Sequence, residues 1–376
     1  PFDPDMASMI HNEMRKHGIK LVLGYTVEGF KEKDNGVEVL LKDNPSLQAD
    51  MVVLAIGVTP DTVLAKEAGL ELGIKESIVV NDRMETSVPD IYAAGDAVQV
   101  KHYVTGNDAL ISLAGPANKQ GRIIADNICG GDSRYLGSQG SSVIKVFDMT
   151  AATTGINETN AKKSGLEVDT VILSPMSHAG YYPGGKVMTM KVIFEKESYR
   201  LLGAQIIGYE GVDKRIDVLA TAIHAGLNAT QLKDLDLAYA PPYSSAKDPV
   251  NMAGFMIDNI AKGTLKQWHL EDMDKISKDK DVVLLDVRTV GEFSRGHIDG
   301  FKNIPVDELR ERISEIEKGK PVYLICQSGL RSYIASRILE GNGYETYNFS
   351  GGFRFYDAVV NDRALIERAY ACGMDY

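Results

Sequence analysis

The pattern of apolar and polar positions predicts mixed α/β structure over the first part of the chain. An Asp-Pro pair at 3–4 is typical of a helix start, and Gly18 is typical of its end. The turn residues Asp-Asn-Gly at 34–36 lie between two alternating runs and indicate a β-hairpin. Short apolar runs predict strands, and one amphipathic run predicts a helix. The strands are expected at 19–23, 51–56, 78–81 and 91–94, and the helix at 122–128.

From residue 143 the pattern changes to strands with few helices between them. This succession is typical of an α+β domain on an antiparallel sheet. Asn157 is expected to cap a short helix, and residues 212–225 a longer one. The residues at 264–270, which carry the only Trp, are interpreted as a linker. The strands are expected at 143–147, 151–156, 168–174, 187–194 and 201–209.

Beyond the linker, strand and helix patterns alternate again. This alternation predicts a small parallel α/β domain of roughly 100 residues. Strands are expected at 282–286, 322–325 and 346–349, and helices at 306–317 and 332–340. The fold class is therefore α/β, with an antiparallel α+β domain in the middle of the chain.

Composition narrows the class of protein. The 376 residues are 44% hydrophobic and 25% charged, which fits two or three globular domains and excludes a disordered or collagen-like chain. A net charge of −11 argues against a nucleic-acid partner. Three Cys indicate a reducing, cytoplasmic setting, and the uncharged run at 51–60 is too short for a membrane span. Because the chain opens with Pro1 at a helix start, we expect it to be part of a longer polypeptide.

The sharpest chemical signal is the loop that follows the predicted strand at 322–325. The strand ends at Cys326, Gly329 allows a tight loop, and Arg331 opens a helix. Backbone N–H groups of such a loop, together with the helix N-terminus, favour a nucleophilic thiolate. A buried core Cys is the alternative, but it does not explain the Gly and Arg at these spacings. Cys326 and Arg331 are therefore predicted to be catalytic.

The C-terminal motifs resemble a rhodanese domain over about residues 271–357. The resemblance implies that Cys326 accepts a sulfane sulfur as a persulfide and passes it to a thiol. The loop at 326–331 has the length of sulfur-handling members, whereas the related phosphatases have one residue more. For Arg288 and His297, an exposed ion pair and a strand-edge position are favoured over a place in the pocket. The motifs are Asp-Val-Arg at 286–288, Glu-Phe at 292–293, Gly-His-Ile-Asp-Gly at 296–300, Asn-Ile-Pro at 303–305 and Gly-Gly-Phe at 351–353.

An Ala-Gly-Asp-Ala motif ends the predicted strand at 91–94. Its Gly95, Asp96 and Ala97 can place a carboxylate against a hydroxyl while backbone N–H groups face a phosphate. Taken alone the motif is a weak signal, because such turns occur in many loops as Asx-turns.

With its neighbours, the motif resembles the flavoprotein pyridine nucleotide-disulfide oxidoreductases. These neighbours are the Ala-Ile-Gly-Val-Thr-Pro segment around Gly57 and the helix start at 113–122. The resemblance implies that Asp96 holds the ribityl chain of FAD and that Gly57 lies near the nicotinamide of NAD(P)H. Pro116 and Ala117 would face the flavin.

Part of that family's pattern is missing from this sequence. No G-x-G-x-x-G fingerprint occurs, so the nucleotide-binding motifs and the redox-active Cys are expected upstream of Pro1. Cys129 is interpreted as a passive residue at a helix end. Cys372 is unassigned, with a free thiol as the simplest interpretation. No metal site is predicted.

Three segments of the middle domain resemble coenzyme A-disulfide reductases: 178–184, 211–218 and 237–249. The resemblance implies a homodimer whose interface domain reaches into the partner's active site. It places Tyr181 and Tyr239 near the reacting sulfur and flavin. Interface packing is the alternative for the first tyrosine segment, and a rigid turn for the Pro-Pro-Tyr segment of the second.

The same resemblance assigns coenzyme A contacts to Asn118 and Lys247. It also implies four domains: an NAD(P)-binding part at 1–70, an FAD-binding part at 71–143, a dimerisation domain at 144–262 and a rhodanese domain at 270–376. The predicted function is reduction of CoA disulfides, CoA persulfides or polysulfides by NAD(P)H, coupled to sulfur transfer.

Other functions stay open at this point. They are an NADH oxidase or peroxidase, a sulfur-relay or redox-sensing binding protein with a vestigial reductase half, and, more weakly, a tyrosine-phosphate hydrolase. The sequence selects neither the natural sulfur substrate nor NADH over NADPH.

Overall fold

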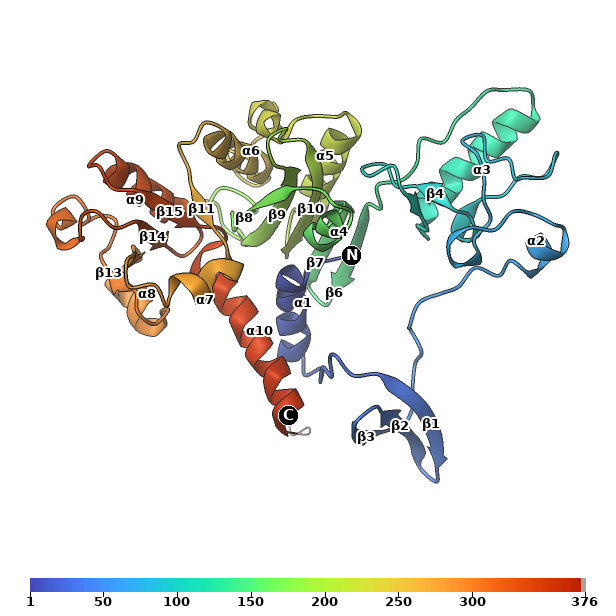
Figure 1. Cartoon of the computed structure of the whole chain (residues 1–376), viewed down its shortest axis with the longest axis horizontal. Coiled ribbons are helices and arrows are strands. Elements are labelled where there is room, and N and C mark those ends of the chain that lie inside the picture. Colours follow the sequence, from blue (N-terminus) through green and yellow to red (C-terminus); the bar gives the residue numbers. More distant parts are fainter. Residues whose placement is uncertain (373–376) are drawn as a thin grey trace. The chain divides into compact units, whose positions relative to one another are not determined.

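The computed structural model describes residues 1–372 and divides into two compact units (Figure 1). The larger unit combines Pro1–Ile19 with Ser142–Leu365, and the smaller unit is built on Lys20–Ser141. The side chain of Cys372 lies outside the described part, so its interpretation stays a prediction. The first helix, α1 (Pro4–Lys16), belongs to the larger unit, and the domain boundary expected at residue 70 also stays a prediction.

The smaller unit opens with a three-stranded antiparallel sheet of β1 (Val27–Lys33), β2 (Gly36–Leu41) and β3 (Asn44–Ala49). The hairpin expected at 34–36 is confirmed. Gly36 has φ of 129°, and a Cβ at this position would lie 2.4 Å from the Ala49 carbonyl oxygen. Only glycine fits the turn for both reasons.

The remainder of the smaller unit has little regular structure. Of its predicted strands, 19–23 and 51–56 are wrong, and 78–81 and 91–94 form only isolated bridges. The predicted helix at 122–128 is confirmed but begins earlier. Its elements are α2 (Val63–Glu67), the 3₁₀ turns η1 (Ile74–Glu76) and η2 (Gly95–Ala97), β4 (Val100–Lys101), β5 (Asp108–Ala109) and α3 (Ala114–Ile128).

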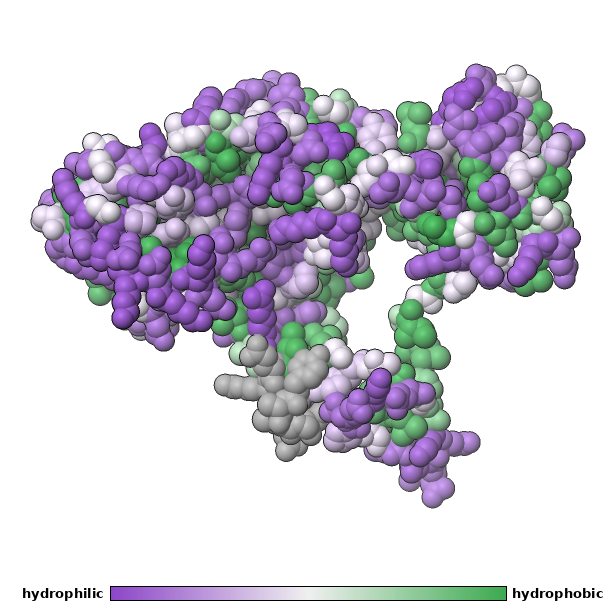
Figure 2. Space-filling model, in the orientation of Figure 1, coloured by the Kyte–Doolittle hydropathy of each residue, from purple (hydrophilic) through white to green (hydrophobic). Residues whose placement is uncertain are grey.

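The failed strand at 51–56 has a direct physical cause. A strand needs a neighbour for its N–H and C=O groups, and no strand of the described residues pairs with this segment. Its apolar side chains are exposed, Ile56 to 90%. They form a continuous apolar strip along the extended chain between β3 and α2 in Figure 2.

The middle of the larger unit is a five-stranded antiparallel sheet in the order β6-β7-β10-β9-β8. All five strands predicted here are confirmed to within two residues. Helices α5 and α6 lie on one side of the sheet and α1 on the other (Figure 1). The elements are β6 (Ser142–Val146), β7 (Met149–Gly155), α4 (Glu158–Lys163), β8 (Val168–Leu173), β9 (Met188–Glu195), β10 (Leu201–Gly208), α5 (Val212–His224), η3 (Ala229–Asp234) and α6 (Pro249–Ala261).

The two helix predictions of this domain are confirmed. Asn157 caps α4, because its side chain accepts a hydrogen bond of 2.8 Å from the backbone N–H of Asn160. The helix expected at 212–225 is α5.

The C-terminal part is a five-stranded sheet whose paired strands are all parallel, in the order β11-β15-β14-β12-β13. The predicted parallel α/β domain is confirmed. The elements are β11 (Gln267–Trp268), η4 (Leu270–Asp272), α7 (Met273–Ile276), β12 (Val283–Asp286), α8 (Val290–Arg295), β13 (Lys302–Asn303), η5 (Ile313–Glu315), β14 (Val322–Ile325), α9 (Leu330–Glu340), β15 (Thr346–Phe349) and α10 (Gly352–Cys372).

Two predictions in this region are wrong. The segment at 306–317 forms turns and the 3₁₀ turn η5 instead of a helix, although its apolar side chains do pack on the core as the periodicity indicated. The supposed linker at 264–270 contains strand β11. Trp268 is 2% exposed and packs on Phe349, so it belongs to the core of the C-terminal domain.

The two sheets of the larger unit are joined by a shared core. Phe355 and Val359 of α10 pack with Met6 of α1 and with Ile172 and Ile207 of the antiparallel sheet. At the end of β15, the Ser350 hydroxyl accepts a hydrogen bond of 3.0 Å from the Ile172 N–H.

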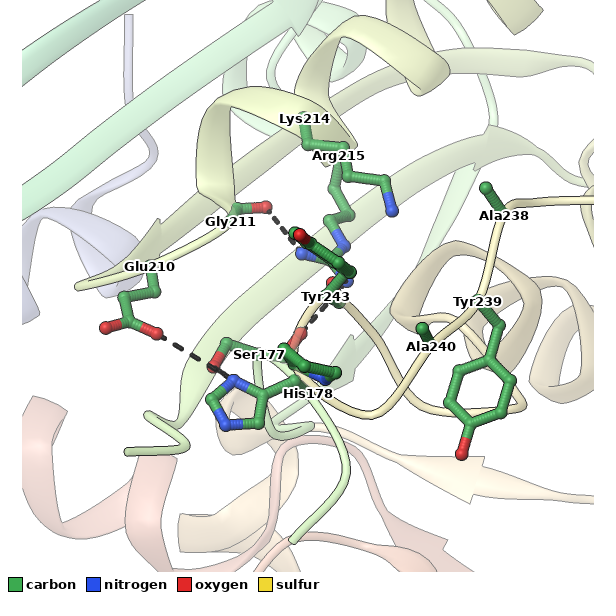
Figure 3. A pocket seen from close by; sticks show the side chains of 11 residues that line it. Ser177, His178, Glu210, Gly211, Lys214, Arg215, Ala238, Tyr239, Ala240 and Tyr243 are labelled. Carbon is green, nitrogen blue, oxygen red and sulfur yellow. Dashed lines mark hydrogen bonds and ion pairs between the residues drawn. The ribbon is translucent and has the colours of Figure 1, made fainter. Parts of the chain in front are cut away.

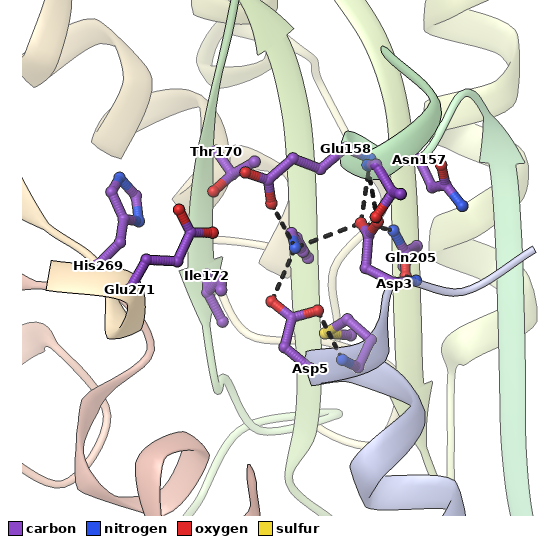
Figure 4. A network of polar contacts seen from close by, with 12 residues as sticks. Asp3, Asp5, Asn157, Glu158, Thr170, Ile172, Gln205, His269 and Glu271 are labelled. Carbon is purple, nitrogen blue, oxygen red and sulfur yellow. Dashed lines mark hydrogen bonds and ion pairs between the residues drawn. The ribbon is translucent and has the colours of Figure 1, made fainter. Parts of the chain in front are cut away.

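A buried ion network also holds α1 to the antiparallel sheet (Figure 4). The Lys191 ammonium group is fully buried and lies 2.8 Å from Asp5, 2.7 Å from Glu158 and 3.3 Å from Asp3. Burial alone would lower the pKa of Lys191, but the three carboxylates outweigh it and raise the pKa. Among the residues described, no helix combines the length and apolar character that crossing a bilayer requires.

Candidate functional site

The loop after β14 surrounds a cysteine sulfur with hydrogen-bond donors. Cys326 follows the last residue of β14, and α9 begins four residues later. The N–H of Gly329 lies 3.1 Å from Sγ, and the Ser332 hydroxyl 3.2 Å. Cys326 is 1% exposed, as a core cysteine would be. A purely structural cysteine does not need two donors directed at its sulfur, and such donors stabilise a thiolate or persulfide.

Asn348 of β15 competes with Ser332 for the carbonyl oxygen of Gly329. Its amide nitrogen lies 3.2 Å from the Gly329 carbonyl oxygen, and the Ser332 hydroxyl lies 3.1 Å from the same oxygen. A hydroxyl has one proton to donate. The Tyr333 N–H donates to this carbonyl oxygen as well, at 3.1 Å. Because Asn348 and Tyr333 together supply two donors to the carbonyl, the hydroxyl of Ser332 is available to the sulfur.

The start of α10 supports the loop from behind. The Phe353 N–H donates to the Cys326 carbonyl oxygen at 2.8 Å. Gly352 has φ of 71°, and a Cβ there would lie 2.7 Å from the Gln327 oxygen. The Gly-Gly-Phe motif therefore allows the close approach that directs the loop carbonyls away from the sulfur.

Arg331 is held by a carboxylate of the neighbouring helix. Its two terminal nitrogens each lie 2.7 Å from one oxygen of Glu292. Glu292 also accepts hydrogen bonds from the N–H and hydroxyl of Thr289, which caps α8. The bond from Arg331 is the main reason that the pKa of Glu292 is lowered to about 2. Sequence reasoning missed this role of Glu292, although the Thr-x-x-Glu pattern marks the helix start.

The expectation for Arg288 is corrected. It is 1% exposed and pairs at 2.7 Å with buried Asp286, so the ion pair is internal. Its guanidinium lies 3.4 Å from the Gln327 side chain and 3.8 Å from the Phe353 ring centroid. Arg288 thus contacts the loop, whereas His297 is exposed and its ring nitrogen lies 3.1 Å from the Phe293 carbonyl oxygen.

Two tyrosines from separate segments of the middle domain meet. The hydroxyl groups of Tyr181 and Tyr239 are 2.8 Å apart, and Tyr181 is 77% exposed. The hydrogen bond that Tyr239 shares with Tyr181 is the main cause that raises the pKa of Tyr239. Tyr239 is therefore a neutral phenol at physiological pH and can donate a proton to a sulfur leaving group.

A cavity of about 510 Å³ opens beside Tyr239 (Figure 3). Arg215 is buried at its base, 3.0 Å from Asp248. Lys247 precedes Asp248 in sequence, is exposed, and is not among the described residues that line the cavity. The sequence segments at 178–184 and 211–218 indicated this region without predicting a cavity. The other lining side chains include Ser177, His178, Glu210, Lys214 and Tyr243.

The Ala-Gly-Asp turn lies against the start of α3. Gly95 has φ of 85°, and its N–H donates to the Gln120 side chain at 2.7 Å. A Cβ on Gly95 would lie 3.9 Å from that of Ala117. The exposed Asp96 therefore stands beside a helix N-terminus, which fits the hydroxyl and phosphate groups of a flavin nucleotide.

The other predicted residues of the smaller unit lie as follows. Pro116 and Ala117 are in the first turn of α3, and Ala97 closes the turn η2. The exposed Asn118 donates to the Ala114 carbonyl oxygen within α3 at 2.9 Å. Gly57 lies in the exposed segment that follows β3.

Comparison with known families covers nearly the whole chain. Residues 1–121 match the pyridine nucleotide-disulphide oxidoreductases, and residues 141–249 match their dimerisation domain. The chain belongs to this family. Residues 269–358 match the rhodanese-like domain.

Two solved structures resemble the larger part of the chain. Reduced CoADR-RHD of Bacillus anthracis is 46% identical, with a TM-score of 0.93 over 96% of this chain and 65% of that chain. A NAD-dependent persulfide reductase from A. fulgidus is 40% identical, with a TM-score of 0.88 over 94% of this chain and 64% of that chain.

Two curated relatives are each 36% identical. The match to an NADH oxidase of Methanocaldococcus jannaschii covers 67% of this chain and 55% of the relative. The match to a CoA-dependent NAD(P)H sulfur oxidoreductase of Pyrococcus abyssi covers 66% and 55%. The chain therefore spans little more than half the length of these relatives.

Proposed function

We propose that this protein is a flavin-dependent NAD(P)H reductase of CoA disulfides, CoA persulfides or polysulfides, coupled to sulfur transfer through Cys326. The observation that carries the proposal is the Cys326 sulfur with the Gly329 N–H and the Ser332 hydroxyl directed at it. This sulfur lies in a rhodanese-like domain of an oxidoreductase-family chain.

In this proposal the smaller unit contributes to the cofactor sites. Gly95, Asp96 and Ala97 would hold the ribityl and phosphate groups of FAD, with Pro116 and Ala117 facing the flavin. Gly57 would lie near the nicotinamide. FAD and NAD(P)H would together supply hydride and electron transfer, which amino-acid side chains do not provide.

The middle domain would act in a homodimer and face the substrate. Tyr181 and Tyr239 would hand a proton to the thiolate that leaves when an S–S bond is reduced. Asn118 and Lys247 would contact coenzyme A, Lys247 as a point charge for phosphate. A reducing, cytoplasmic location fits a reactive thiol.

The decisive test replaces the nucleophile in the full chain. Cys326→Ser should lower sulfane transfer to cyanide by about a thousandfold or more, because a covalent nucleophile is lost. Cys129→Ser is the matched control, since Cys129 is exposed and lies in the other unit. Transfer that persists in Cys326→Ser and disappears in Cys129→Ser would disprove the proposal.

The tyrosines have a separate test. Tyr181→Phe and Tyr239→Phe should each slow disulfide reduction about tenfold to a hundredfold, as loss of a general acid does. Dimer dissociation, measured by analytical ultracentrifugation, should change less. Equal losses of both properties would support interface packing instead.

Dioxygen reduction is a second candidate, because a relative named NADH oxidase matches this chain. The rhodanese-like domain has no role in that reaction and favours the first proposal. Oxygen consumption with NADH in the absence of any thiol or disulfide would favour the oxidase.

A further inference from the structure

The arginine within the Cys326 loop and the arginine that contacts this loop are each paired with a carboxylate. Arg331 makes two 2.7 Å hydrogen bonds to Glu292, and Arg288 lies 2.7 Å from Asp286. Each pair leaves only a dipole, whose field falls off faster than that of a single charge. The donors that contact the sulfur are the Gly329 N–H and the Ser332 hydroxyl, and both are uncharged.

We infer that Glu292 makes the Cys326 loop selective for sulfur donors whose reacting end carries little charge, such as alkyl thiosulfonates and organic persulfides, over dianionic thiosulfate. The inference rests on the proposed function, because it requires sulfur transfer at Cys326. A donor must approach a thiolate of like charge, and a dianion is repelled twice as strongly as a monoanion. An unpaired arginine would offset this repulsion, and Glu292 removes that compensation.

The carboxylate of Glu292 is held independently of Arg331. It accepts a hydrogen bond of 3.0 Å from the Thr289 N–H and one of 2.9 Å from the Thr289 hydroxyl. Because the pKa of Glu292 is about 2, the group stays ionised at every pH at which a thiolate reacts. The selectivity should therefore be a constant property of the site.

The transfer step balances without any further reactant. The Cys326 thiolate attacks the outer sulfur of a thiosulfonate, a new S–S bond forms on Sγ, and the donor S–S bond breaks. The electron pair leaves with the sulfinate, and the total charge is −2 before and after. With thiosulfate the leaving group is sulfite and the total charge is −3. Cyanide then takes the outer sulfur as thiocyanate and restores the thiolate.

The test compares two donors on the full chain, thiosulfate and methanethiosulfonate, with cyanide as acceptor. Glu292→Gln should raise kcat/KM for thiosulfate about tenfold, since Arg331 becomes an unpaired cation beside the loop. The value for methanethiosulfonate should rise by no more than about threefold. An unchanged ratio of the two values would overturn the inference.

A control variant and a second measurement separate the possible outcomes. Glu308→Gln also removes a carboxylate from a surface arginine pair, 2.8 Å from Arg312, and should leave the donor ratio unchanged. In the wild type, added salt should favour thiosulfate relative to methanethiosulfonate, because mobile ions screen the repulsion that a charged donor meets as it approaches the site from solvent. A ratio that does not respond to salt would also contradict the inference, and this measurement needs no folded variant.

Failure of the proposed function would look different. In that case Cys326→Ser would transfer sulfur from both donors, or the wild type from neither. If the wild type transfers sulfur through Cys326 but Glu292→Gln leaves the ratio of kcat/KM for the two donors unchanged, only the selectivity is disproved.

Discussion

The two units of the chain contain similar apolar runs, which are buried in the larger unit and exposed in the smaller unit. In the larger unit, strands β9 and β10 are buried along nearly their whole length between helices and neighbouring strands. In the smaller unit, the equally apolar segment at 51–58 is extended and exposed. The contrast teaches that an apolar run becomes a strand only where the chain supplies both a pairing strand and a cover.

The candidate sites differ in the same way. The Cys326 loop is enclosed by β14, α8, α9 and the start of α10, all within one domain. The turn at Asp96 is bonded to Gln120 of α3 and to the N–H of Ile78, and its carboxylate is exposed. Cys326 is therefore enclosed within one domain, whereas the Asp96 carboxylate is open to solvent.

The largest contrast between the units is expected on truncating an apolar side chain. Phe355→Ala should lower the free energy of unfolding of the larger unit by about 3–5 kcal/mol, because it opens a cavity in the shared core. Ile56→Ala, in the exposed segment, should change the free energy of unfolding of the smaller unit by less than about 0.5 kcal/mol. Urea unfolding measures both, followed by the fluorescence of Trp268, the single Trp, for the larger unit and by circular dichroism for the smaller unit. Equal effects would remove the contrast.

The next effect concerns the buried ion network. Lys191→Met should cost about 3 kcal/mol of unfolding free energy, because three carboxylates lose their buried partner. Lys266→Met breaks an exposed pair with Glu345 in the same unit and should cost less than about 1 kcal/mol. The same urea titration applies. A tolerated Lys191→Met would show that the network is replaceable by apolar packing.

A smaller effect is expected at the loop itself. Asn348→Leu should slow alkylation of Cys326 by iodoacetamide about threefold to tenfold, because Ser332 would then donate to the Gly329 carbonyl instead of the sulfur. Asn342→Leu, at an exposed position beyond the end of α9, is the control. Mass spectrometry of the modified cysteine measures the rate. An unchanged rate would mean that Ser332 keeps its bond to the sulfur without help.

The smallest effect is a pH dependence of stability. The Glu292 pKa is lowered from 4.5 to about 2, so its bond to Arg331 contributes its full stabilisation above pH 4.5 and loses it as the pH falls towards 2. Glu292→Gln should flatten this part of the acid unfolding curve, by less than about 1 kcal/mol for a partly exposed pair. Circular dichroism over that range tests it, with Glu308→Gln as the control. A wild-type curve that is already flat there would contradict the lowered pKa.

The sequence predicted those parts of the fold that local patterns specify. The five strands of the antiparallel sheet, strands β12, β14 and β15 of the parallel sheet, the cap at Asn157 and the hairpin at 34–36 follow from alternation, caps and turn residues within a few positions. The helix predicted at 306–317 is wrong, because its apolar residues at helical spacing pack on the core from a series of turns instead of from a helix.

What the sequence by itself determined was the family, the domain types and the Cys326 loop, since contiguous motifs carry them. Only the tertiary structure decided which distant side chains meet. Arg331 pairs with Glu292, which lies 39 residues away in the sequence, and Tyr181 is hydrogen-bonded to Tyr239, 58 residues away. Such pairs depend on how whole helices and strands pack, and no periodicity along the chain encodes a contact between two elements.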